Sequence, residues 1–332
     1  MQIQNPIRWG IMGCGKIAQL FAEGLATIPD ARLQGVASRT LEKATRFGKT
    51  HHANSYYGSY EALVKDDKID VIYIATPHVF HHSNTLLCLQ HKKAVLCEKP
   101  FAMNRPQVEE MIAEAKKQNV FLMEALWTYF LPHYQYVLEL VNSGEMGAIT
   151  ALKADFGFVG NSDPKARLFN KELGGGSLLD IGIYPIFAAL TILGKPENIK
   201  AKARYSTTGI DENCHMFFTY KNDVKAVLYS DITKKTATEI HISFEKGNLV
   251  VHSNFHQPSH ITITKNGIAE FIEFPDTSNG YNYEAIHVQK MLRSGKKESP
   301  IMTFDRSLEL IQLLDTVRKK IGLTYLDATN IN

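Results

Sequence analysis

The spacing of apolar residues changes near residue 125, and this change constrains the fold more than any other feature of the chain. Before it, short unbroken apolar runs alternate with longer segments whose apolar residues recur at the helical period. Strands that read as unbroken apolar runs are buried on both faces, which is typical of a parallel sheet covered by helices on both sides. Residues 1–124 therefore predict a doubly wound α/β domain of the Rossmann type.

The elements of this domain are predicted from the same pattern. Strands are expected at 7–12, 33–38, 71–75, 94–97 and 120–123, and helices at 16–26, 40–49, 80–91 and 106–118. Open α/β sheets bind ligands beyond the carboxyl ends of their strands. The segments that follow each strand are therefore where a binding site is expected.

Beyond residue 150, apolar and polar residues alternate instead. Ile199, Ala201 and Ala203 are expected on one face of a strand, with lysines between them on the other, which indicates an antiparallel sheet with one face on a core. Asn266-Gly267 is a strong hairpin signal. Helices are expected at 131–142, 178–193 and 306–321. Residues 125–332 therefore predict an α+β domain with a large, open, mostly antiparallel sheet that serves substrate binding and oligomerisation.

Composition agrees with two folded domains and excludes several partners. The chain has 332 residues, about twice the usual length of one domain. Its formal charge is only +3, and its 37 basic residues form no long run that could follow a phosphate backbone. We therefore expect no nucleic-acid partner.

The cysteines and the apolar segments indicate where the protein works. Cys14, Cys88, Cys97 and Cys214 lie far apart without CxxC spacing, so neither a zinc site nor a disulfide framework is expected, which suits a reducing compartment. The first residues lack the apolar core of a signal peptide. No stretch approaches the roughly 20 apolar residues of a membrane span. We expect a cytoplasmic protein without membrane association.

The turn after the first strand has the spacing of a dinucleotide-binding loop. Gly13 permits a tight turn, Gly15 lets the backbone approach a pyrophosphate, and the small Ala18 lets helix and strand pack closely. The phosphates would lie at the positive end of the helix. The alternative is a simple strand-to-helix turn. Because the motif opens an alternating α/β pattern, we predict that it binds a cofactor through residues Gly13, Cys14, Gly15, Lys16 and Ile17.

The end of the second strand indicates which dinucleotide is preferred. NAD-binding sites place a carboxylate there for the ribose 2′-hydroxyl, whereas this chain has Ser38-Arg39. A guanidinium can bond the extra phosphate of NADP, and Lys43 on the next helix adds a second cation. The alternative is that Arg39 is a solvated surface residue. We predict NADP as the cofactor, with NAD less favoured.

Two further strand ends carry polar residues. Thr76, Pro77, His78 and His81 follow the strand at 71–75, and Glu98-Lys99-Pro100 follows the strand at 94–97. A lysine at a buried strand end can exchange a proton near neutral pH, because desolvation lowers the pKa of its ammonium. The alternative for Glu98 and Lys99 is a structural ion pair. His81 is expected either to contact the nicotinamide ribose or to cap its helix.

A second constellation lies in the other domain. Gly174-Gly175-Gly176 precedes Ser177, a possible helix N-cap, and a helix that carries Asp180 and Tyr184 four residues apart. A phenol beside an ammonium favours its phenolate, so Tyr184 and Lys99 are candidates for a proton relay with Asp180 as the supporting carboxylate. The triple glycine either admits a ligand or is simply a loop. Spacing alone does not bring these residues together.

His252, His256 and His260 recur every four residues, which on a helix would suggest a metal site. Pro258 and the strand pattern argue against a helix there, so no metal is expected. The second face of the open sheet mixes polar and apolar positions. Pairing such a face with its own copy is a common solution, so we expect a homodimer or a dimer of dimers.

Several segments together resemble a known family. GCGKIA, the strand-end SR, ATPHVFH, EKP and GGGSLLDIGIY occur in the order and approximate spacing of the glucose-fructose oxidoreductase, inositol dehydrogenase and MocA (Gfo/Idh/MocA) family. MEALWT at 123–128 and YEAIHV at 283–288 look most like its branch of dimeric dihydrodiol dehydrogenases and NADP-dependent D-xylose dehydrogenases. The resemblance covers essentially the whole chain.

The resemblance implies roles for particular residues. It makes Lys99 the central catalytic residue, gives Tyr184 a place where much of the family has histidine, and makes Trp127 a wall beside nicotinamide and substrate. It also implies a cis Lys99-Pro100 bond. Tyr129 stands where an arginine is expected in dihydrodiol dehydrogenases, which leaves the substrate open.

We therefore expect an NADP-dependent dehydrogenase acting on a secondary hydroxyl of a small sugar, polyol or trans-dihydrodiol. The alternative is a sensor that binds the nucleotide without turnover. The residues expected to contact the substrate are Trp127, Tyr129, Phe158, Arg167 and Tyr283.

Overall fold

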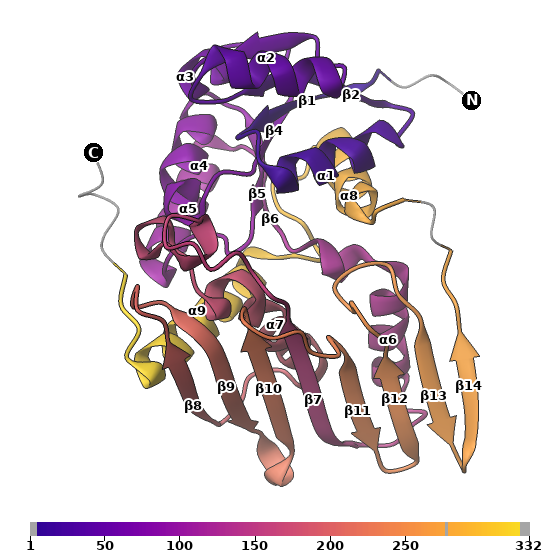
Figure 1. The fold of residues 1–332 in the computed structure, drawn as a ribbon. Helices are drawn as coiled ribbons and strands as arrows, with labels where there is room; N and C mark the ends of the chain where they lie inside the picture. The colour runs from indigo at the N-terminus through magenta and orange to yellow at the C-terminus, as the bar shows by residue number, and fades with distance from the viewer. Residues whose placement is uncertain (1–4, 276–277, 326–332) are drawn as a thin grey trace. The chain divides into compact units, whose positions relative to one another are not determined.

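The computed structural model describes residues 5–275 and 278–325, which form two compact units (Figure 1). The first unit comprises Met1–Trp127 and Thr277–Leu308, and the second comprises Thr128–Asp276 and Glu309–Asn332. The sequence predicted a single boundary between residues 124 and 125. The division differs because the later segment packs on the first unit, where Asn279 Nδ2 donates to the carbonyl of Leu20 at 2.7 Å.

The first unit contains a six-stranded parallel sheet, which confirms the predicted doubly wound domain. The strand order is β3-β2-β1-β4-β5-β6 (Figure 1). The strands are β1 (Ile7–Met12), β2 (Ala31–Ala37), β3 (Ser55–Tyr57), β4 (Val71–Ile74), β5 (Ala94–Glu98) and β6 (Leu122–Ala125). The sequence missed β3, because three half-buried residues at a sheet edge give no apolar run.

The helices of this unit begin and end close to the predicted residues. They are α1 (Lys16–Ala26), α2 (Leu41–Thr50), α3 (Tyr60–Val64), α4 (His81–Gln90), α5 (Arg105–Gln118) and α8 (Tyr281–Arg293). Side chains define two of the starts: Thr40 Oγ1 accepts from Lys43 N at 3.4 Å, and Asn104 Oδ1 accepts from Gln107 N at 3.0 Å. The sequence predicted neither α3 nor α8.

Aromatic rings fill the core between the sheet and α1. Trp9, Phe21 and Tyr73 are fully buried, and the rings of Phe21 and Tyr73 stack with centroids 3.7 Å apart. Tyr281 of α8 meets Phe21 edge-on at 6.5 Å. This shared cluster explains why a segment so late in the chain belongs to the first unit, since aromatic surface contributes most when buried.

The second unit contains an eight-stranded sheet, and its mostly antiparallel pairing is as predicted. The order is β14-β13-β12-β11-β7-β10-β9-β8, with β7 and β10 the one parallel pair among the strand pairs described. The strands are β7 (Ile149–Gly157), β8 (Asn198–Tyr205), β9 (Asp211–Thr219), β10 (Lys225–Asp231), β11 (Ile240–Phe244), β12 (Gly247–Val251), β13 (Ile261–Lys265) and β14 (Ile268–Ile272). Burial alternates along β9, β10 and β11, as alternating sequences predict.

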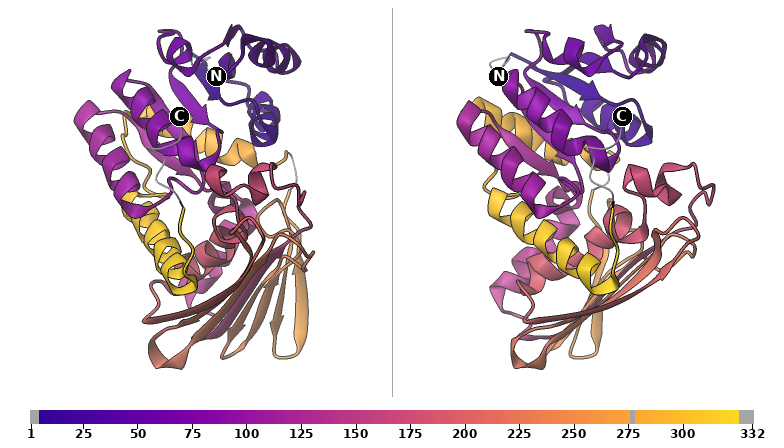
Figure 2. Two further views of the ribbon diagram at one scale, coloured as in Figure 1. Left: turned by 60° about the vertical axis from the view of Figure 1, so that its left-hand side comes forward. Right: turned by 90° about the vertical axis from the view of Figure 1, so that its left-hand side faces the viewer.

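Helices cover one face of this sheet. α6 (Pro132–Ser143) and α7 (Ile183–Leu193) lie on the same side, and among the described residues no helix lies on the other (Figure 2). α9 (Phe304–Ile321) begins in the first unit and ends in the second. The open face predicted from the sequence is therefore present.

One segment is longer and more apolar than the sequence reading allowed. Lys171–Leu193 spans 23 residues with a mean hydropathy of 1.7, enough by length and composition to cross a membrane. However, 89% of its most apolar window is buried inside the protein. The segment therefore behaves as the core helix of a folded domain.

Candidate active site

The loop between β1 and α1 has the geometry of a phosphate-binding turn. Gly13 has φ of +95°, and an added Cβ there would lie 2.8 Å from the carbonyl oxygen of Ala75. An added Cβ on Gly15 would meet nothing within 4 Å. Gly15 precedes the first turn of α1, whose free N–H groups favour an anion. The residues present therefore fit a dinucleotide, with Lys16 and Ile17 exposed beside the turn.

Two cations gather at the end of β2. Burial raises the pKa of the Cys14 thiol to about 11, and the nearby positive charge of Lys43 lowers that pKa by a smaller amount. Burial also raises the pKa of the Tyr60 phenol, and the positive charge of Arg39 opposes that rise. Ser38 is buried and Arg39 is exposed. The sequence missed Tyr60, which would have been noticed had the short β3 before it been recognised.

The turn after β4 is held by a histidine. His81 is fully buried, with Nδ1 2.8 Å from the carbonyl of Pro100 and Nε2 2.8 Å from the carbonyl of Thr76. Both ring nitrogens are thus engaged by backbone, which joins the ends of β4 and β5, and the contact of His81 with the nicotinamide ribose stays a prediction. Pro77 and His78 form the start of the intervening 3₁₀ turn, and the ring of His78 lies 5.7 Å from that of His81.

The end of β5 carries Glu98 and Lys99. Glu98 is buried and its carboxylate accepts from the hydroxyl of Tyr73 and, at 3.2 Å, from the backbone N–H of Lys99. Lys99 is half-buried, and the Lys99-Pro100 bond is cis, as the resemblance implied. Glu98 is therefore held by the Tyr73 hydroxyl and by backbone, and the catalytic role of Lys99 stays a prediction.

A second carboxyl lies next to this turn. Glu124 of β6 accepts from the N–H of Phe101 at 3.0 Å. Burial raises the pKa of Glu124 to about 7, the charge of Glu98 raises it further, and the charge of Lys99 lowers it. Glu124 is not among the residues predicted from the sequence, because the apolar run that predicts this strand ends at Met123.

Trp127 lies at the end of the first unit's N-terminal segment. It is buried and stacks on Tyr281 of α8, with ring centroids 4.2 Å apart and planes 9° from parallel. Tyr283, also in α8, is half-buried. A flat aromatic pair of this kind is a suitable wall for a planar ring.

In the second unit, the helix that carries Asp180 and Tyr184 begins with a π turn, Leu178–Gly182, which continues into α7. Ser177 does not cap it, since its hydroxyl donates to Ser230 Oγ at 2.7 Å. Asp211 of β9 takes that place, accepting from Leu178 N at 2.6 Å. Burial raises the pKa of Asp211 to about 8.

The triple glycine before this helix is required by the protein's own packing. An added Cβ on Gly175 would lie 2.5 Å from the carbonyl oxygens of Arg167 and Leu168. Gly176 has φ of +124°, and an added Cβ there would overlap Asp211 Oδ1. Of the two alternatives left open, the tight loop is the one the geometry favours.

Tyr184 and Asp180 have distinct surroundings. Arg167 Nη2 pairs with Asp180 Oδ1 at 2.7 Å, which joins a predicted substrate residue to the predicted supporting carboxylate. Tyr184 is buried, with its ring 5.5 Å from Phe156 and 5.3 Å from His256. His256, considered in the sequence only as a metal ligand, is thus a neighbour of Tyr184.

Phe158 and Tyr129, which are also predicted to contact the substrate, differ in burial. Phe158 is half-buried and lies 6.2 Å from Phe156. Tyr129 is buried, edge-on to Phe187 at 5.1 Å and to Tyr134 at 6.2 Å. Tyr129 therefore packs among aromatic rings of the second unit, and its contact with a substrate stays a prediction.

The three spaced histidines do not converge on one point. His252 and His260 stack at 4.6 Å, and His252 Nε2 bonds Thr262 Oγ1 at 2.8 Å. Within residues 5–275 and 278–325, no group of three or more His, Cys, Asp or Glu side chains is arranged to hold a metal ion.

Comparison with known proteins defines the class. Residues 7–126 match the model of the "Oxidoreductase family, NAD-binding Rossmann fold", and residues 134–250 match the "GFO/IDH/MocA C-terminal domain". The chain therefore belongs to the Gfo/Idh/MocA family of oxidoreductases, with an NAD(P)-binding Rossmann domain, as its motifs indicated.

Curated relatives match over nearly the full chain. The chain is 39% identical to trans-1,2-dihydrobenzene-1,2-diol dehydrogenase of Xenopus tropicalis, covering 96% of this chain and 99% of that protein. It is 36% identical to the human enzyme of that name, covering 96% and 98%.

Solved structures share the fold. A 3-ketoreductase from Actinomadura kijaniata, in complex with NADP and TDP-benzene, has a TM-score of 0.87 at 27% identity and covers 96% of this chain and 98% of its own. An aldose-aldose oxidoreductase from Caulobacter crescentus, complexed with glycerol, has a TM-score of 0.88 at 24% identity, covering 97% and 100%. The latter likeness concerns the fold alone.

Proposed function

We propose that this enzyme is an NADP-dependent dehydrogenase that oxidises a secondary hydroxyl of a small sugar, polyol or trans-dihydrodiol, or reduces the matching carbonyl. The observation that carries the choice of NADP is the pair of cations, Arg39 and Lys43, near Cys14 and Tyr60 at the end of β2. The related dihydrodiol dehydrogenases and the NADP-bound 3-ketoreductase support the reaction class.

In the proposed mechanism, side chains of the protein take up or donate the proton of the substrate hydroxyl. When bound, the nicotinamide supplies the hydride chemistry, so the protein must orient the substrate and manage the hydroxyl proton. We assign that proton to Lys99, with Tyr184 as the second group of the relay. Asp180, paired with Arg167, orients the substrate from its own helix, and Trp127 stacked on Tyr281 presents a flat wall. Tyr129, Phe158 and Tyr283 are the remaining substrate contacts we propose.

Turnover with NADP and a panel of aldoses and diols, followed by absorbance of the reduced cofactor, tests the proposal. Lys99→Met is expected to lower kcat by at least about 10²-fold, the low end of general acid–base contributions, while NADP still binds. Lys92→Met is the matched control, because Lys92 is exposed and its ammonium donates to the side-chain and backbone oxygens of Gln118, at 2.6 and 3.1 Å. Full turnover in Lys99→Met would refute the role, and binding without turnover in the wild type would identify a sensor.

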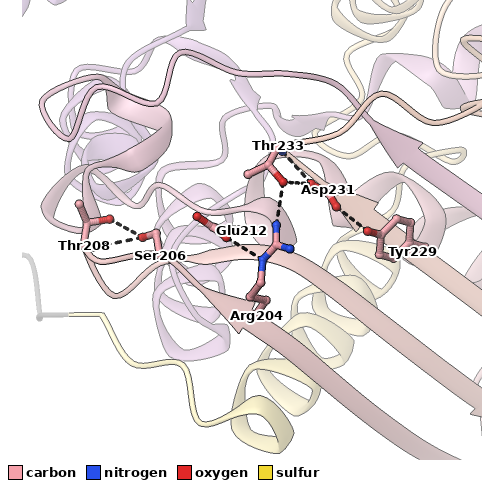
Figure 3. A network of polar contacts seen from close by, with 7 residues as sticks. All are labelled: Arg204, Ser206, Thr208, Glu212, Tyr229, Asp231 and Thr233. Atoms are coloured by element: carbon pink, nitrogen blue, oxygen red, sulfur yellow. Dashed lines mark hydrogen bonds and ion pairs between the residues drawn. The ribbon is translucent and has the colours of Figure 1, made fainter.

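We also propose that two copies pair through the open face of the second unit's sheet. On β9 and β10 of that face, Phe217 is 41% and Val227 38% exposed. At its edge, polar groups satisfy one another: Arg204 donates to Glu212 and Thr233 at 2.8 Å each, and Asp231 accepts from Thr233 (Figure 3). Exposed apolar side chains close to polar groups that satisfy one another suit an isologous contact.

Light scattering tests this pairing. Phe217→Glu is expected to give a monomer, whereas Ile286→Glu on α8 of the first unit, where Ile286 is 46% exposed, serves as the control. A wild type that is already monomeric would exclude the dimer. We place the enzyme in the cytoplasm, in keeping with its four free cysteines.

A further inference from the structure

α8 carries a buried acid that the proposed mechanism does not use. Glu284 is fully buried, and neither of its carboxyl oxygens has a hydrogen-bond partner. Buried polar groups are nearly always hydrogen-bonded, and burying an isolated ionised carboxylate is very unfavourable. An acid in this position therefore needs a physical reason.

The surroundings of Glu284 come from three elements of the first unit. Glu98 from the end of β5, Tyr73 from β4 and Tyr281 from the start of α8 interact electrostatically within one cluster. Burial and the charge of Glu98 both raise the pKa of Glu284 well above its ordinary value. Burial, Glu98, Tyr281 and Glu284 together raise the pKa of Tyr73 as well. The cluster thus contains two acids and two phenols.

The hydrogen bonds decide which acid carries the charge. Glu98 accepts from the Tyr73 hydroxyl and from the Lys99 N–H, and such donors stabilise a carboxylate. Glu284 accepts from none. Two carboxyls in one buried site cannot both ionise without large repulsion, so the proton resides on the acid without donors.

We infer that Glu284 is a positioning residue, a neutral acid that allows Glu98, the residue before Lys99, to stay ionised in this buried cluster. This inference rests on the proposed role of Lys99. Glu124 is a further titratable group here, since its carboxyl interacts with the charges of both Glu98 and Lys99. If Glu284 lost its proton, a second negative charge would lie in the cluster with Glu98 and favour the ammonium form of Lys99, which opposes proton uptake from a substrate hydroxyl.

Infrared spectroscopy tests the protonation state without turnover. In the spectrum of wild type minus Glu284→Gln at neutral pH, we expect the carbonyl band of a protonated carboxylic acid to be lost with the substitution. Gln289→Leu, a buried change on the same helix, is the control and should lose no such band. A difference that contains only carboxylate bands would overturn the inference.

The pH profile tests the functional consequence. Glu284→Gln keeps a neutral donor of the same shape, so kcat near neutral pH should stay within about 3-fold of wild type, and the alkaline limb should move to higher pH. A superimposable alkaline limb, or a large loss of kcat at neutral pH in a folded variant, would overturn the positioning role. Failure of the proposed function is distinguishable, because it would appear as turnover retained in Lys99→Met, whereas the infrared result does not depend on Lys99.

Discussion

The glycine-containing turns of the two units look alike in sequence but serve different purposes. Each precedes a helix, yet the space beside Gly15 in the first unit is empty, whereas backbone carbonyls and Asp211 occupy the space beside Gly175 and Gly176 in the second. The first turn is shaped for a ligand and the second for the protein itself. A glycine motif therefore indicates close approach of backbone to something, and only the fold decides to what.

The largest effect is expected when a methyl group is added to each turn. Gly176→Ala would strain a residue at φ +124° and overlap Asp211, so we expect a loss of about 2–6 kcal/mol, from backbone strain and overpacking of about 1–3 kcal/mol each. Gly15→Ala should leave the urea midpoint near that of wild type but weaken NADP binding. Equal destabilisation by both substitutions would show that the two turns are not different in kind.

A second test uses pH and sets Asp211 against Asp231. The pKa of Asp211 is raised to about 8, whereas its unfolded value is about 3.9. Between those pH values the unfolded chain loses this proton and the folded chain keeps it. The contribution of the protonated Asp211 to the free energy of unfolding is therefore complete below pH of about 4 and is lost as pH rises through about 8. Asp211→Asn should therefore flatten the fall of thermal stability over this window, an effect of a few kcal/mol, about 1.4 per pH unit at most.

Asp231 is the matched control for that experiment. Burial acts to raise its pKa, but hydrogen bonds from Tyr229 and Thr233 outweigh burial and lower it. Its contribution is therefore present above the unfolded pKa and is lost as pH falls through the folded value. Asp231→Asn should change the acid side of the melting profile and leave the window above pH of about 5 unchanged. The same response in both variants would contradict the assignment.

A third test concerns ligand binding in the first unit. Arg39→Asp should weaken NADP binding by about 1.5–3 kcal/mol, the usual contribution of a hydrogen bond to a charged group, and should affect NAD much less. Titration of both cofactors measures the ratio. An unchanged ratio of the two affinities would show that Arg39 does not select the cofactor.

The smallest expected effect compares the observed cap of α2 with the cap predicted at Ser177. Thr40→Ala removes a real cap of α2 and should destabilise the protein by about 1 kcal/mol. Ser177→Ala removes no cap but breaks the buried bond to Ser230, so its effect should disappear in a Ser230→Ala background, as a double-mutant cycle would measure. Additive effects of Ser177→Ala and Ser230→Ala would contradict that coupling.

The features that depend on neighbouring residues could be predicted from the amino-acid sequence. The turn at Gly13 and Gly15, the strand end that presents Lys99, and the basic residues after β2 all follow from backbone sterics, apolar period and position along one segment. The alternation that separates the two faces of the second sheet is local in the same sense. Each of these could be predicted because a residue's place in a strand or turn is set mainly by the residues beside it.

Distant groups that share an environment became evident only in the folded structure. Asp211 lies at the helix start where Ser177 was expected, His256 lies beside Tyr184, Tyr129 packs among aromatic rings, and the charge of Glu98 acts on Glu284. These pairings depend on which segments pack together, and packing follows from the summed burial of whole elements. The identity of one side chain does not indicate which elements will pack around it. Its partners, and therefore its protonation state, become evident only in the folded chain.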